Sequence, residues 1–201
     1  MILQSIGSIT ESTVQPIIGA EIGAEILPPS EIADLALWYE VQTANVIKDG
    51  SNNVTQHTDL SGNARHATQA TVANTYSFVD SVINGNPITR SSGSSGRYTF
   101  DGTFFQNSDA TVISVQKRTA GGQNIIFGAD SQNNVVRWEY ANDTSIRFTT
   151  RSGQGPTAAS AAPATPYAGG SEPFRIMAVT FSNTSGIKFY QESYTYSKKC
   201  Q

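Results

Sequence analysis

The chain has 201 residues, of which 38% are hydrophobic and only 14% are charged, and its net charge is −3. Its polar residues are mainly Ser, Thr, Asn, Gln and Gly, which suit strands, turns and exposed sheet faces better than long helices. Basic residues occur in no run longer than a pair, as at Lys117-Arg118. A nucleic-acid partner needs a basic stripe to neutralise phosphates, so the composition excludes one and predicts an all-β protein.

Residues 1–29 differ from the rest of the chain because they contain no Lys, Arg or aromatic residue. Ile18, Ile22 and Ile26 recur with a period of four, which places them on one side of either a helix or a strand. The glycines between them weaken a helix. Such a segment cannot bury its isoleucines alone, so it is either a partly ordered tail or an arm that docks on a partner subunit. The isoleucines favour the anchoring arm, since disordered tails usually lack them.

No export or membrane segment is expected. Ser5, Ser8 and Thr10 interrupt the apolar residues at the start, and no basic residue precedes them, unlike in a signal peptide. No stretch approaches the roughly 18 apolar residues of a membrane span. The single cysteine, Cys200, excludes an intrachain disulfide and fits a protein made in a reducing cytoplasm.

The domain proper is expected over residues 30–201, opening with a helical turn through Asp34 that Ser30 caps. Strands are predicted at 35–40, 75–82, 97–100, 110–116, 124–128, 135–140, 145–150, 174–181 and 186–190. Many short strands separated by turn signals are typical of a sandwich or barrel. Residues 152–173 are rich in Ala, Pro, Gly, Ser and Thr and are interpreted as a long surface loop. A linker between two domains is the alternative, although few residues follow it to build a second core.

Four motifs then occur in a fixed order: Leu37-Trp38-Tyr39-Glu40, Asp59-Leu60-Ser61-Gly62-Asn63, Asn84-Gly85-Asn86-Pro87 and Phe100-Asp101-Gly102. In this order they resemble the laminin-G-like jelly rolls of the concanavalin A-like lectin superfamily. The resemblance implies an antiparallel jelly-roll sandwich. It also implies strands beyond Tyr190, where few residues remain, so the fold is expected to be completed by another chain or to be a shortened version.

The Asp59 motif is interpreted as a structural turn. The Asp59 carboxylate can accept hydrogen bonds from the turn's backbone, and Gly62 and Asn63 tolerate positive φ. A metal site is the alternative, but no second carboxylate lies close in sequence. Trp38 and Phe100 are expected in the core, with a sugar-stacking platform as the weaker interpretation.

Residue patterns that carry catalysis are missing from the sequence. Glycosidases of this superfamily place carboxylates at alternate positions of one strand, whereas Glu139 and Asp143 lie four residues apart across a turn signal. His57 and His66 are the only histidines and lack the spacing of a zinc site. We therefore expect no enzymatic activity, no cofactor and no bound metal.

Two classes of function remain open. The first is a structural or attachment protein of a virus particle, such as a phage fibre, decoration or tail component, made in the host cytoplasm and held by its arm to other virion proteins. This interpretation expects a homo-oligomer such as a trimer, with a host glycan as a further candidate ligand and no nucleic-acid or membrane partner. The alternative is a carbohydrate-binding, lectin-like module of a bacterial surface protein. Fold alone does not decide between them.

Overall fold

The computed structural model describes residues 2–4, 28–91, 96–105, 109–121, 124–128, 137–142, 145–149, 158–161, 173–182 and 186–194. Strands dominate these residues and the only helices are short 3-10 turns, so the all-β prediction is confirmed. The chain divides into two compact units. We call Gln4–Asp101 the N-terminal unit, and Gly102–Gln201 with Met1–Leu3 the C-terminal unit.

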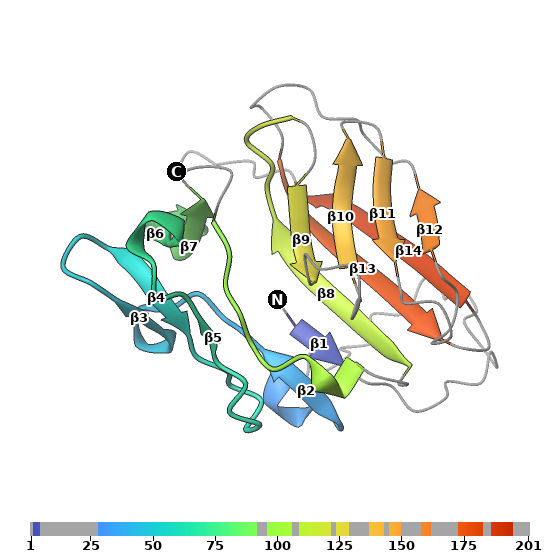
Figure 1. The fold of residues 1–201 in the computed structure, drawn as a ribbon, viewed down its shortest axis with the longest axis horizontal. Coiled ribbons are helices and arrows are strands. Elements are labelled where there is room, and N and C mark those ends of the chain that lie inside the picture. The colour runs from blue at the N-terminus through green and yellow to red at the C-terminus, as the bar shows by residue number, and fades with distance from the viewer. Residues whose placement is uncertain are drawn as a thin grey trace, which may run out of the picture. The chain divides into compact units, whose positions relative to one another are not determined.

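The N-terminal unit is built around one antiparallel sheet. The unit contains β2 (Leu35–Trp38), which is not a strand of this sheet, and β3 (Val46–Lys48), β4 (Asn53–His57), β5 (Ala67–Thr68), β6 (Tyr76–Ile83) and β7 (Asn86–Ser91). The sheet has the order β3-β4-β6-β7, with β5 paired to β4 (Figure 1). Asn84 and Gly85 connect β6 to β7 with φ of 51° and 80°, which is the pair of positive values that a tight hairpin requires.

The core of this sheet is small. Val46, Val54 and Phe78 form a buried cluster, against which Val41 and Tyr98 pack. The Lys48 ammonium lies over the Phe78 ring, 4.1 Å from its centre. A strand-like alternation in β3, β4 and β6 therefore places one apolar side chain of each strand on the same face.

Several expectations for this unit are corrected by the structure. Trp38 and Phe100 are only partly buried; alternation along β2 and the residue that follows it buries Leu37 and Tyr39 in place of Trp38. The turn near Ser30 is a 3-10 turn, η1 (Pro29–Glu31), whose N-cap is Pro28 and which has no side-chain cap. The strand expected at 97–100 reduces to a single bridge between Thr68 and Thr99.

The C-terminal unit contains two antiparallel sheets. Its strands are β8 (Ala110–Gln116), β9 (Asn124–Gly128), β10 (Arg137–Asn142), β11 (Ser145–Thr149), β12 (Ala158–Ala161), β13 (Phe174–Ser182) and β14 (Gly186–Tyr194). One sheet has the order β12-β11-β10-β9, and the other runs β14-β13-β8 and continues to β1 (Ile2–Gln4). In Figure 1 the β9–β12 sheet, yellow to orange, lies in front of β13 and β14.

The two sheets face each other across an apolar interior. The Tyr140 hydroxyl on β10 donates to the Met177 Sδ on β13 at 3.0 Å, and the ring centres of Phe148 and Phe181 lie 5.1 Å apart. Trp138 and Phe148 are 0% exposed. Residues of β10 and β11 that point toward β13 are thus aromatic or branched, as sheet-on-sheet packing requires.

Strands β8 and β9 have the predicted bounds, and β13 and β14 begin at the predicted residues. The interpretation of residues 152–173 as a loop throughout is wrong, since Ala158–Ala161 forms β12 and pairs with β11. These four residues carry little hydrophobic bulk, and they form a strand because they pair with β11. Of the proposed arm, Ile2–Gln4 forms a strand of the chain's own sheet, whereas Ile18, Ile22 and Ile26 lie outside the described residues.

Candidate functional site

The turn at Asp59 gathers the densest group of polar contacts in the N-terminal unit. The Asp59 carboxylate accepts hydrogen bonds from the backbone N–H groups of Trp38 (3.1 Å), Ser61 (3.0 Å) and Arg65 (2.9 Å). It also accepts one from the Ser61 hydroxyl at 2.9 Å. Both carboxylate oxygens are therefore engaged, and they join the turn to the end of β2.

The other turn residues complete this connection. The Asn63 side-chain amide donates to the carbonyl oxygens of Leu35 (3.0 Å) and Ala36 (3.2 Å). Gly62 has a φ of 88°, but the second positive φ falls at Ala64 (56°), which corrects the expectation that Asn63 takes it. Asn63 instead connects the turn to β2 through its side-chain amide, and the sequence did not predict this role.

The electrostatics of Asp59 fit this bonding. Burial alone would raise the pKa of its carboxyl, but the hydrogen bonds from Ser61, Arg65 and Trp38 outweigh burial and hold the pKa below its ordinary value. The carboxylate is thus kept ionised and bound to the protein's own backbone. Among the described residues, no three His, Cys, Asp or Glu side chains are grouped so that they could hold a metal ion.

His57 lies in an aromatic environment next to this turn. Its ring centre is 4.7 Å from that of Tyr98 and 6.2 Å from that of Tyr39. The side chain is only 8% exposed, and burial lowers the pKa of His57 to about 4. His66 accepts a hydrogen bond at Nδ1 from the Asp59 backbone N–H at 3.1 Å. Each histidine therefore has a packing or hydrogen-bonding role.

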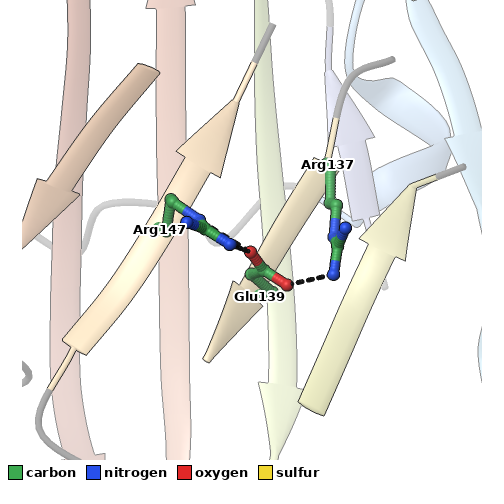
Figure 2. A network of polar contacts seen from close by, with 3 residues as sticks. All are labelled: Arg137, Glu139 and Arg147. Carbon is green, nitrogen blue, oxygen red and sulfur yellow. Dashed lines mark hydrogen bonds and ion pairs between the residues drawn. The ribbon is translucent and has the colours of Figure 1, made fainter. Parts of the chain in front are cut away.

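Figure 2 shows a second polar group, in which Glu139 of β10 lies between Arg137 and Arg147. Glu139 Oε2 is 2.5 Å from Arg137 Nη2, and Oε1 accepts from Arg147 Nε at 2.7 Å and also from Arg147 Nη2. The Glu139 side chain is 0% exposed, against 23% for Arg137 and 41% for Arg147. We call these three residues the Glu139 triad.

Alternation places the Glu139 triad on the sheet face opposite the apolar interior. Trp138 and Tyr140, its neighbours in β10, point toward β13, so Glu139 points away. Glu139 and Arg147 are direct cross-strand partners. Because both carboxylate oxygens are bound by guanidinium groups, the triad connects β10 to β11, and the sequence did not single it out.

A third feature is the outer face of the β8–β13–β14 sheet, which carries exposed apolar side chains. Val115 is 60% exposed, Ile176 41% and Tyr190 53%. Val115 pairs directly with Ile176 across β8 and β13, and Ala178 of β13 pairs with Tyr190 of β14. We call this set the outer apolar face. Its sequence signal was the nearly continuous apolar run of β13, which suits a strand with apolar side chains on both faces.

Comparison of the chain with family models, with curated proteins and with solved structures gives no match. Within the described ranges, no helix has the length and hydropathy of a membrane span.

Proposed function

We propose that the chain is a non-enzymatic structural or attachment protein of a virus particle, such as a fibre, decoration or tail component of a phage. We also propose that its fold is a jelly roll of the concanavalin A-like type. Two antiparallel sheets packed face to face, as in the C-terminal unit, are the layer arrangement that jelly rolls use.

The observation that carries the proposal is the outer apolar face. Exposed apolar residues that adjoin one another mark surfaces that associate with a partner, whereas scattered ones need no explanation. Val115 and Ile176 are direct cross-strand partners, and Tyr190 stands opposite Ala178, two residues along β13 from Ile176, so the three exposed residues lie on one face of the sheet. An assembly protein needs such a surface, and the isoleucines at 18, 22 and 26 supply a second apolar segment for attachment to other virion proteins.

The bonding of the carboxylates supports a structural role over a catalytic one. An acid–base carboxylate must reach a substrate proton at hydrogen-bond distance. The oxygens of Asp59 are bound by backbone N–H groups and a hydroxyl, and those of Glu139 by two arginines. The protein should therefore turn over no glycan in a panel of glucans and host glycans. A turnover that Glu139→Gln abolishes would contradict this.

The location is tested by labelling intact phage particles with antibodies raised against the purified chain. Label on the particles is expected, whereas label confined to the bacterial surface would overturn the proposal and favour the lectin-like module. A variant with Ile18→Asn, Ile22→Asn and Ile26→Asn keeps β1 and should fold, yet its occupancy on particles should fall. Normal occupancy of that variant would show that the anchor lies elsewhere.

A further inference from the structure

Strand β14 is the last of the described strands in its sheet. It pairs with β13 along all nine of its residues, from Gly186 opposite Ser182 to Tyr194 opposite Phe174. Within the described ranges, no strand pairs with its other edge. Alternate N–H and C=O groups of an antiparallel strand point to each side, so this edge presents a row of backbone donors and acceptors that a further strand can bind.

The charged residues of β14 are spaced so that two copies of the strand can pair with opposite charges facing each other. In an antiparallel pair of two β14 strands centred on Tyr190, Lys188 of each copy stands opposite Glu192 of the other. A pair centred one residue later would place Lys188 opposite Tyr194 and lose both charge pairs. Opposite charges directly across a sheet stabilise pairing and like charges oppose it, so the charges select the Tyr190-centred register.

The apolar residues agree with this register. Tyr190 lies on the same sheet face as Ala178, its partner in β13, and is 53% exposed. At the centre of the pair, the two Tyr190 residues become cross-strand neighbours, and aromatic pairs of this kind stabilise sheets. The outer apolar faces of the two copies then join into one band across a continuous sheet.

We propose that β14 is an interface between two copies of this chain, which pair antiparallel along β14 with Tyr190 on the two-fold axis. A closed two-fold contact uses the same surface on both partners, as this strand does. The proposal uses no residue of the isoleucine-rich segment and stands whether or not the protein belongs to a virus particle.

The test is the mass of the purified full-length chain in solution, measured by sedimentation across a range of concentrations. The wild type should form a dimer or another even-numbered assembly. Lys188→Glu alone, or Glu192→Lys alone, turns both attractive pairs into repulsive ones. Either change should raise the dissociation constant of the β14 contact by about tenfold or more, so that the assembly separates into halves and its measured mass falls. The double variant with Lys188→Glu and Glu192→Lys restores both pairs and should restore the mass.

Arg90→Glu is the matched control, since it reverses an exposed charge on β7 in the other unit and should leave the mass unchanged. Circular dichroism of each variant establishes that the strands are retained. A wild type that is monomeric at every concentration would overturn the proposal. So would an assembly that neither single reversal weakens, or one that the double variant does not restore.

Discussion

The two units bury their interiors by different means. The C-terminal unit packs one sheet against another and encloses large side chains completely, with Trp138 and Phe148 at 0% exposure. The N-terminal unit contains the β3-β4-β6-β7 sheet, and its buried cluster of Val46, Val54 and Phe78 is small. Polar contacts in the same unit connect segments far apart in sequence, such as the bonds from Asn63 to Leu35 and Ala36. In this unit, turns with fixed hydrogen bonds connect the strands to segments far apart in sequence.

The two tryptophans give the strongest test of this comparison. Trp138 is fully buried, and truncation of a buried aromatic to Ala typically costs about 3–5 kcal/mol. Trp138→Ala should therefore lose a large part of the unfolding free energy in urea, whereas Trp38→Ala should lose clearly less because Trp38 is partly exposed.

Trp138→Phe is the conservative control. The Trp138 indole N–H is buried with no hydrogen-bond partner among the described residues, so Phe keeps most of the packing and loses no bond. Equal losses for Trp138→Ala and Trp38→Ala would show that the two interiors do not differ as described.

These two residues also show what the sequence could and could not predict. The strands of the C-terminal unit were readable from alternation and apolar runs, as at β8, β9 and β13. Burial of Trp38 was predicted from residue type, but a shift of one position along a strand moves a side chain to the other face, and Leu37 is buried in its place.

The polar contacts were predictable only in part. The bonding of Asp59 follows from a turn motif confined to a few residues. The Glu139 triad depends on the pairing of β10 with β11, and the positions of Glu139 and Arg147 in sequence do not reveal that they are cross-strand partners. Strand β12 was not predicted for the same reason. Its residues have low hydrophobicity and form a strand only because they pair with β11.

Acid should affect the N-terminal unit through His57. In the unfolded chain this histidine binds a proton with a pKa near 6.5, whereas in the folded protein its pKa is about 4. Stability is thus complete above pH 6.5 and declines as the pH falls from 6.5 toward 4, by on the order of 3 kcal/mol.

Urea unfolding between pH 7 and pH 4.5 measures this decline. His57→Gln removes the titrating group and should flatten the dependence over that range. An unchanged slope in His57→Gln would mean that other groups cause the acid sensitivity and that the aromatic environment of His57 does not exclude its charged form.

A smaller loss is expected when the Asp59 turn is weakened. Asp59→Asn replaces an acceptor oxygen with a donor that faces the N–H or hydroxyl donors of Ser61 and Arg65, which should cost about 2 kcal/mol. Asp49→Asn is the matched control, since Asp49 accepts similar bonds from Ser51 and Asn53 in a fully exposed turn. Thermal unfolding should separate the two variants. A loss for Asp49→Asn that equals the loss for Asp59→Asn would contradict the importance of burial.

The Glu139 triad has a consequence for how the C-terminal unit folds. In the native pairing Trp138 stands opposite Phe148 and Glu139 opposite Arg147, so apolar and charged pairs alternate. A slip of one residue between β10 and β11 would bring Glu139 opposite Phe148 and leave its carboxylate without its directly opposite arginine. A chain that collapses in the slipped register would keep the Arg137 contact of Glu139, which lies within β10, but would lose the contacts with Arg147 while the carboxylate stays buried, at a cost that the native register avoids. The triad thereby excludes misaligned hairpins while the sandwich is assembling.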